Sequence, residues 1–196
     1  MTRHDSKSDE ALIEAIERGD GDAAACLYYR HIDRVHRICC RIVLDSSQAP
    51  DCVQEVWMKV FRNLGQFRCE RSFATWLNAI AAHTAIDFCR RHKRRRKPVS
   101  LDETCTESLP AEPTEAGPQY DDATIRREIR NALGQISVNQ RTAFVLRYFE
   151  EMPLPEIAKV LRCRQGTVRT HIRRCLLSLR VKLADRLNQE VQEHGQ

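Results

Sequence analysis

The chain has 196 residues, of which 30% are charged and 42% hydrophobic, and it carries a net charge of +5 at pH 7. This length allows one or two small domains with adequate cores, and no apolar run is long enough to cross a membrane, so we expect no membrane insertion. Because the N-terminal residues are charged, we expect no secretory signal peptide and a cytoplasmic location.

The N-terminal quarter of the chain predicts two helices separated by a glycine-containing break. A short helix is expected over residues 9–18, with Asp9 as its N-cap, and it ends at a Gly-Asp-Gly break over residues 19–21. A second helix is expected over residues 22–44. The polar residues 45–47 then interrupt the pattern.

A third helix, over residues 50–64, is the clearest core element of the sequence. Its apolar residues recur at alternating steps of three and one, which places them on one stripe: Val53, Val56, Trp57, Val60, Phe61 and Leu64. The opposite, polar face suits either water or a partner protein, and the spacing does not separate the two. This face carries a mixed polar set: Asp51, Gln54, Glu55, Lys59, Arg62 and Asn63.

A fourth helix is expected over residues 72–95, with its apolar side facing inward. It runs into a strongly basic stretch over residues 90–97, where seven of eight positions are Lys or Arg. A helix that packs for several turns and then emerges as a cationic rod is typical of an element that contacts phosphates. The alternative is a basic tail that aids solubility or targeting. The inward-facing residues are Phe73, Trp76, Leu77, Ile80, Ala81 and Phe88.

The middle of the chain predicts a linker. Residues 98–120 contain five acidic residues, four of the seven prolines and no Lys or Arg, a composition that cannot assemble a core. Fully extended, the 24 residues 98–121 span about 80 Å at roughly 3.3 Å per residue. We therefore divide the chain into a helical domain over residues 1–97, an acidic, proline-rich linker over 98–121 and a second helical domain over 122–196.

The second domain contains a helix-turn-helix pattern. A first helix from Leu154 and a second helix from Gln165 each carry apolar residues at helical spacing, and residues 162–182 include seven basic residues and no acidic one. The outward side of the second helix can donate hydrogen bonds to base edges and phosphates, although a basic helix is often only a solvated surface. The residues expected to pack are Leu154, Ile157, Ala158, Leu161, Val168, Ile172, Cys175, Leu176 and Leu179.

The nine cysteines do not predict a disulfide scaffold, because their number is odd and no Cys-x-x-Cys pair occurs. Cys39 and Cys175 fall on apolar helix faces, where a free thiol packs like a small hydrophobic residue. Cys69 and Cys105 lie in predicted loops and are the better candidates for reactive thiols. We expect no metal site and no cofactor.

Three segments, in this order, resemble the bacterial RNA polymerase sigma factors of the extracytoplasmic-function (ECF) group of the sigma-70 family. Residues 51–64 resemble the helix of sigma region 2 that binds core polymerase, and residues 72–81 with 87–91 resemble its promoter-melting part. Residues 141–148, followed by the helix-turn-helix, resemble sigma region 4. The resemblance covers residues 10–96 and 122–184. It implies an all-α fold in which a region 2-like bundle and a region 4-like helix-turn-helix domain are joined by a flexible acidic linker.

The resemblance also implies an activity and its partners. Such a protein is a transcription initiation factor that binds the polymerase core through the β′ coiled coil and the β flap, directs it to promoter DNA and assists melting. A free factor is expected to be a monomer held by an anti-sigma factor. Its implied contacts with the polymerase core are made by Asp51, Gln54, Glu55, Lys59, Arg62 and Asn63.

The chain departs from the family at one position of the helix-turn-helix: Arg162 stands where the family has a glycine in the turn.

By the same resemblance, two further sets of residues bind DNA, and no residue is catalytic. The implied contacts with the −10 element are made by Gln66, Arg68, Arg71, Asn78, His83, Arg90 and Arg91. The implied contacts with the −35 element are made by Gln165, Thr167, Arg169, Thr170, Arg173 and Arg174.

Two other classes of protein stay open at this stage. A stand-alone helix-turn-helix regulator with thiol-based sensing accounts for the second domain, but it leaves the helix over residues 50–64 without a role, and such regulators usually dimerise. An enzyme such as a nuclease is disfavoured. The sequence shows no carboxylate cluster with metal-site spacing, no phosphate-binding glycine loop and no nucleophile–base set.

Overall fold

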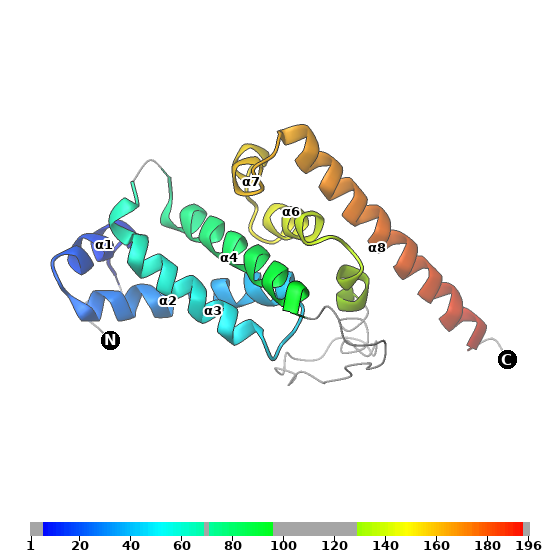
Figure 1. Ribbon diagram of the computed structural model, residues 1–196, viewed down its shortest axis with the longest axis horizontal. Coiled ribbons are helices and arrows are strands. Elements are labelled where there is room, and N and C mark those ends of the chain that lie inside the picture. The colour runs from blue at the N-terminus through cyan, green and yellow to red at the C-terminus, as the bar shows by residue number, and fades with distance from the viewer. Residues whose placement is uncertain (1–5, 69–70, 96–128, 194–196) are drawn as a thin grey trace.

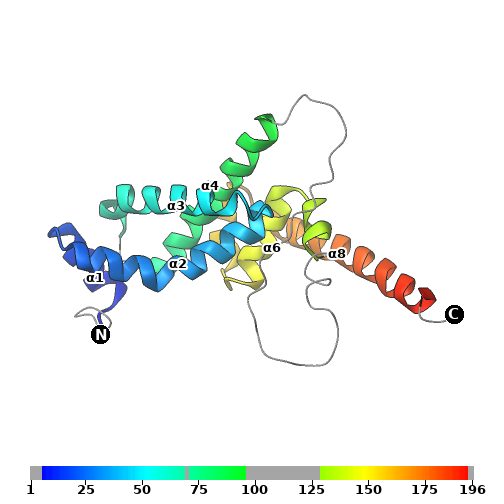
Figure 2. The ribbon, with the colours of Figure 1, turned by 90° about the horizontal axis from the view of Figure 1, so that it is seen from below.

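The computed structural model describes residues 6–68, 71–95 and 129–193, and in this part of the chain every regular element is a helix. Helices α1 to α4 form one unit, and α6 to α8, with the helical residues 129–134, form a second (Figures 1 and 2). The predicted linker lies outside the described residues. The helices are α1 (Asp9–Glu17), α2 (Gly21–Val43), α3 (Ala49–Asn63), the short 3-10 helix η1 (Leu64–Gln66), α4 (Phe73–Arg95), α6 (Val138–Tyr148), α7 (Leu154–Val160) and α8 (Gln165–Glu193).

The first two helices begin at side chains that accept backbone N–H groups. Ser8, and not Asp9, is the N-cap of α1, since its hydroxyl accepts from the Ala11 N–H. The expected cap was therefore wrong by one residue. Asp9 instead reaches α2, where its carboxylate pairs with Arg30 at 2.8 Å and His31 at 2.9 Å. Asp20 caps α2 by accepting from two backbone N–H groups.

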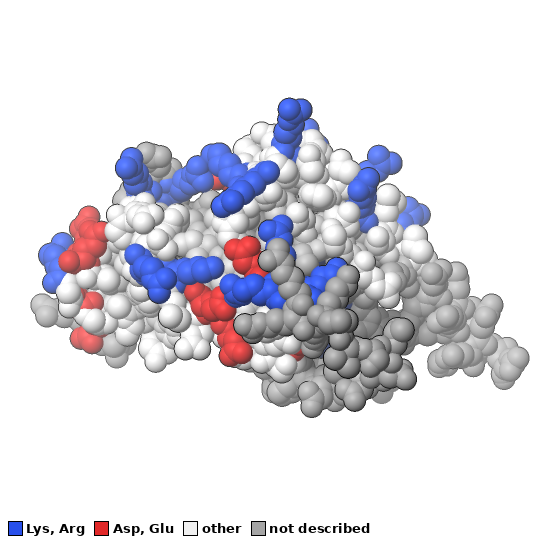
Figure 3. Space-filling view, viewed as in Figure 1, with Lys and Arg blue, Asp and Glu red and all other residues white. Residues whose placement is uncertain are grey.

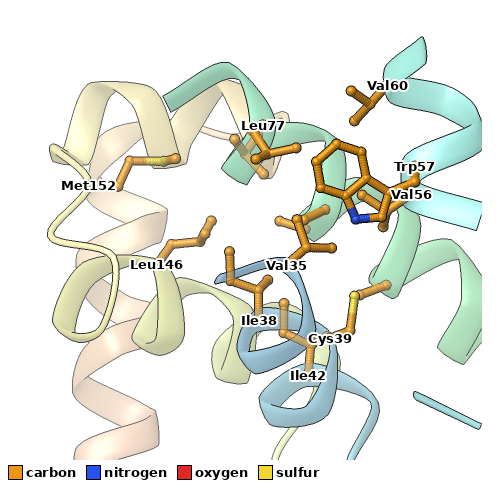
Figure 4. Packing of buried hydrophobic residues seen from close by; sticks show 14 of the residues in the cluster. Val35, Ile38, Cys39, Ile42, Val56, Trp57, Val60, Leu77, Leu146 and Met152 are labelled. Atoms are coloured by element: carbon orange, nitrogen blue, oxygen red, sulfur yellow. The ribbon is translucent and has the colours of Figure 1, made fainter. Parts of the chain in front are cut away.

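Helices α2, α3 and α4 enclose the core of the first unit. Val35, Ile38 and Cys39 of α2 face Val56 and Trp57 of α3, and all of them are buried (Figure 4). The predicted apolar stripe of α3 is confirmed for five of its six residues; the sixth, Phe61, is described with the site below. The fourth predicted helix, residues 72–95, is confirmed within one residue.

In the second unit, α7 and α8 form the predicted helix-turn-helix. Pro155 lies in the first turn of α7, where a missing N–H does no harm. The turn places Arg162 at a φ of +51°, the left-handed conformation that favours glycine. Helix α8 continues well beyond the predicted recognition segment and extends away from the rest of the fold (Figures 1 and 2).

The second unit packs against α2 and α4 of the first. Leu146 of α6 lies beside Val35 and Ile38, Met152 of the next loop belongs to the same cluster, and the buried cluster thus runs on from one unit into the other (Figure 4). Arg141 joins the two units through its guanidinium, which donates to the carbonyls of Leu133 at 2.8 Å and Ile42 at 2.5 Å. These contacts decide which of the predicted site residues face solvent.

Candidate functional site

The outward face of α3 is partly apolar. Asp51, Gln54 and Arg62 are exposed as expected, but Met58 lies among them with 55% of its surface exposed. Phe61, which was expected in the core, is 39% exposed beside it, so that expectation was wrong. Apolar side chains within a polar helix face are typical of a surface that binds another protein.

Three other residues of the predicted polymerase-binding set are engaged within the protein. Arg91 of α4 donates to both carboxylate oxygens of Glu55, at 2.6 and 2.7 Å. The Lys59 ammonium donates to the Thr84 hydroxyl at 3.2 Å, and the Asn63 amide donates to the backbone carbonyl one turn earlier at 2.7 Å. The face that is free to contact a partner is therefore narrower than the polar face of the sequence.

The predicted −10 residues divide into exposed and covered groups. Gln66, Arg68, Arg90 and Arg91 are exposed, and Arg71 is exposed while it pairs with Glu156 of α7. By contrast, only 4% of the Asn78 surface is accessible. His83 is half-buried, with its Nε2 2.6 Å from the Val160 carbonyl oxygen of α7. The second unit thus covers two of the residues expected to capture unpaired bases.

Glu150 of the second unit contacts α2 and Asn78 at this covered surface. Its side chain is only 5% exposed, with carboxylate oxygens 3.6 Å from Arg34 Nε and 4.0 Å from Arg41 Nη1. The Arg41 guanidinium also lies 3.9 Å from the centre of the Phe149 ring. Burial raises the pKa of Glu150 above its usual range, although the neighbouring arginines and a hydrogen bond from Asn78 oppose that rise. The contacts with the arginines and Asn78 therefore do not fully offset the cost of burying this carboxylate.

Arg141 is the other buried charge at the contact between the units. It is 5% exposed, and burial lowers the pKa of its guanidinium, with the thiol of Cys89 acting in the opposite direction. Its Nε has no hydrogen-bond partner among the described residues. Both of its hydrogen bonds end on backbone carbonyls, one in each unit, so the group is structural rather than available to a ligand.

Helix α8 presents all six predicted −35 residues to solvent: Gln165, Thr167, Arg169, Thr170, Arg173 and Arg174. Figure 3 shows Lys and Arg side chains over the α7–α8 turn and along α8, whereas acidic side chains appear over the end of the molecule where α1 lies and over its middle. The basic character predicted for this helix thus lies on an accessible surface.

Two of these six residues line a groove. Arg169 and Arg173 line a depression of about 470 Å³ between α6, α7 and α8, whereas Thr170 and Arg174 do not. Leu176 also lines it and is 41% exposed, so the expectation that Leu176 packs in the core was wrong. The other lining residues are Arg147, Tyr148, Leu154, Ile172, Leu177 and Arg180.

The described cysteines are free thiols, and the two that the sequence placed in the core are poorly suited to redox sensing. A hydrogen bond with Cys52, together with burial, raises the pKa of Cys39, and burial raises the pKa of Cys175 to about 11. Both lie in the core, as expected. A raised pKa disfavours the reactive thiolate. The predicted loop cysteines Cys69 and Cys105 lie outside the described residues.

Within the described ranges, no group of three or more His, Cys, Asp or Glu side chains could hold a metal ion. In the same ranges, no helix combines the length and the apolar character needed to span a membrane.

Comparison with known proteins agrees with this arrangement. Residues 27–95 match the family Sigma-70 region 2, and residues 126–179 match the family Sigma-70, region 4. The ECF RNA polymerase sigma factor SigW of Bacillus subtilis is 31% identical over 182 residues, which cover 88% of this chain and 95% of SigW. The chain belongs to the sigma-70 family, in its ECF group. It is a transcription initiation factor that binds RNA polymerase and directs it to specific promoters.

Two solved structures show the same fold as this sigma factor. The sigma factor RpoE, in complex with the anti-sigma factor NepR from Bartonella quintana, has a TM-score of 0.64 and 19% identity, and the match covers 80% of this chain and 94% of RpoE. CnrH, in complex with the cytosolic domain of CnrY, has a TM-score of 0.62 and 21% identity, covering 90% of this chain and 97% of CnrH. The matches to both sigma-70 regions and to SigW disfavour the stand-alone regulator.

Two residues of the sigma factor's surfaces were missed by the sequence reasoning. Met58 has a local signal, because it is a single apolar residue at the centre of the polar face of α3. Glu150 has none: it is an acidic residue in a basic domain, and its partners on α2 lie more than 100 residues earlier in the chain.

Proposed function

We propose that this sigma factor binds the polymerase core chiefly through the exposed face of α3. The observation that carries the proposal is the exposure of Met58 and Phe61 between Gln54 and Arg62. An apolar centre with a polar rim is the usual composition of a protein interface. By resemblance, the partner of this face is the β′ coiled coil, and a further contact joins the second domain to the β flap.

The two DNA surfaces are assigned to the two domains. The loop after α3 and helix α4 bind the −10 element, where extruding a base costs a few kcal/mol that contacts with the pocket and the phosphates offset. The exposed start of α8 reads the −35 element. The boundaries that we propose are residues 1–97 for the first domain, 98–121 for the linker and 122–196 for the second domain.

The remaining assignments concern partners and chemistry. Sigma factors are non-catalytic transcription factors, and we propose that this chain performs no chemistry and needs no cofactor. RpoE and CnrH were each solved in complex with a second protein, in RpoE an anti-sigma factor, which supports an anti-sigma partner here. We propose a cytoplasmic protein that is monomeric when free of that partner.

The polymerase interface is tested by charging its apolar centre. Met58→Lys is expected to lower the affinity for core polymerase at least about tenfold, which corresponds to about 1.4 kcal/mol, because the ammonium would have to be desolvated in the interface. The measurement is binding of the full-length chain to purified core enzyme. Val181→Lys is the matched control, since Val181 is equally exposed but lies on α8. Equal affinity of wild type and Met58→Lys would exclude this face.

A further inference from the structure

Helix α2 carries a row of arginines that the assigned surfaces do not use. Arg34, Arg37 and Arg41 follow one another at steps of three and four residues, so they lie on one side of the helix over about 10 Å. Asp33, one turn before Arg37, makes no ion pair with it in the described part of the chain. The row therefore presents a concentration of positive charge on one face of α2.

Among the described residues, Glu150 is the carboxylate that faces this row, and it compensates the row poorly. Glu150 approaches Arg34 and Arg41 only to 3.6 and 4.0 Å, whereas Arg30 of the same helix pairs closely with Asp9 of α1 at 2.8 Å. Charge-assisted hydrogen bonds normally measure about 2.7–2.9 Å. Two guanidinium groups thus hold one carboxylate loosely, and Arg37 adds a third positive charge to the row.

The neighbouring polar groups are also incompletely satisfied. Asn78 is buried with its carbonyl oxygen unpaired among the described residues, although its side chain hydrogen-bonds Glu150. A buried polar atom without a partner costs about as much as a lost hydrogen bond. Asn78 also belongs to the proposed −10 set, so the arginine row borders a surface assigned to unpaired DNA.

We propose that Arg34, Arg37 and Arg41 form a binding surface for the sugar–phosphate backbone of DNA, and that Glu150 occupies this surface while the sigma factor is free. A row of guanidinium groups can contact successive phosphates of one strand, each bidentately, which a single carboxylate cannot match. The inference rests on the proposed function, since it requires region 4 to leave region 2 when promoter DNA is bound.

The first test reverses the charge of Glu150, which occupies the arginine row in the free protein. Glu150→Arg places a fourth guanidinium against the row and is expected to separate the two units. The free full-length variant should bind a fluorescein-labelled oligothymidylate about tenfold more tightly than wild type. Glu151→Arg is the matched control, because it adds the same charge at an exposed neighbouring position. Equal affinities of the two variants would overturn the proposal.

The second test removes two arginines of the row from the Glu150→Arg variant, in which the two units are expected to be separated. In the Glu150→Arg background, Arg34→Gln with Arg37→Gln should lower the affinity for oligothymidylate and reduce the slope of log affinity against log salt by about 0.7 for each lost phosphate contact. A merely structural role would leave that slope unchanged, and this result would overturn the proposal. Arg18→Gln, at the C-cap of α1, controls for the loss of a surface arginine.

Two further arms keep the test decisive. If Glu150→Arg fails to fold, Phe149→Ala removes the ring beneath Arg41 at a half-exposed site and should give a smaller increase in binding.

Polyglutamate of equal charge should compete weakly with oligothymidylate, and equal competition would refute the assignment to DNA. Because no polymerase and no promoter element is present, these outcomes do not depend on the Met58 test of the proposed function.

Discussion

Region 4 presents its six proposed −35 residues to solvent along α8, whereas region 2 keeps Asn78 and His83 of its proposed −10 set beneath region 4. Both surfaces carry arginines, so their chemistry is similar. They differ in access, because the covered surface is fixed by contacts between residues far apart in the chain. A free sigma factor of this shape could approach duplex DNA with one domain, while the other could not receive an unpaired base.

The difference in access depends most strongly on Arg141. Arg141→Met would remove the two hydrogen bonds that the charged guanidinium donates to the carbonyls of Leu133 and Ile42, and we expect the free energy of unfolding to fall by about 3 kcal/mol. Urea unfolding followed by circular dichroism measures the change. Arg18→Met, at an exposed position, should change stability by less than about 0.5 kcal/mol. Similar values for the two variants would show that Arg141 does not join the units.

The open surface is tested at the groove side of α8. Arg169→Ala combined with Arg173→Ala should reduce initiation roughly 100-fold at promoters that depend on the −35 element, since each lost base contact is worth about 1–3 kcal/mol. Run-off transcription with reconstituted holoenzyme is the assay. The comparison is with Arg18→Ala, which removes an exposed arginine outside the proposed DNA-binding residues. Equal loss at promoters that lack the element would refute base reading by this pair.

A third prediction concerns Asp9, whose replacement should change the stability of the fold but not the access of reagents to His83. Burial raises the pKa of Asp9, but hydrogen bonds from His31 and Arg30 outweigh it and hold the pKa below its usual range. A lowered carboxyl pKa adds stability that is present above the unfolded-state value, about 4, and is lost as the pH falls through the folded-state value. Asp9→Asn should therefore cost about 2 kcal/mol near neutral pH, and this cost should shrink in acid. A cost independent of pH would contradict the assignment. Access to His83 should not change.

The smallest effect is expected in the turn before α8. Arg162 has a φ of +51°, which costs a non-glycine residue roughly 1 kcal/mol. Arg162→Gly should therefore raise the free energy of unfolding by up to about 1 kcal/mol, partly offset by the greater freedom of glycine in the unfolded chain. Thermal unfolding detects this change. A lower melting temperature would show that the arginine side chain itself stabilises the turn.

The sequence predicted the features that recur along a single helix. It missed the features that depend on contacts between two helices. The spacing of apolar residues placed α3 and α4 within a residue or two, and the basic face of α8 followed from the absence of acidic residues. The cap of α1 was missed because Asp9 is held by Arg30 and His31 of the next helix. The exposure of Phe61 and Leu176 depends on where neighbouring helices end, which helical spacing does not encode.

The covering of region 2 by region 4 is measured most directly by the reactivity of His83 in the free chain. Diethyl pyrocarbonate modification, followed residue by residue with mass spectrometry, compares it with the exposed His36 of α2 as an internal reference. We predict that His83 reacts about tenfold more slowly than His36, as expected for an opening step of about 1.4 kcal/mol, and that the difference shrinks in Glu150→Arg. Equal rates for the two histidines in the free wild-type chain would contradict the account.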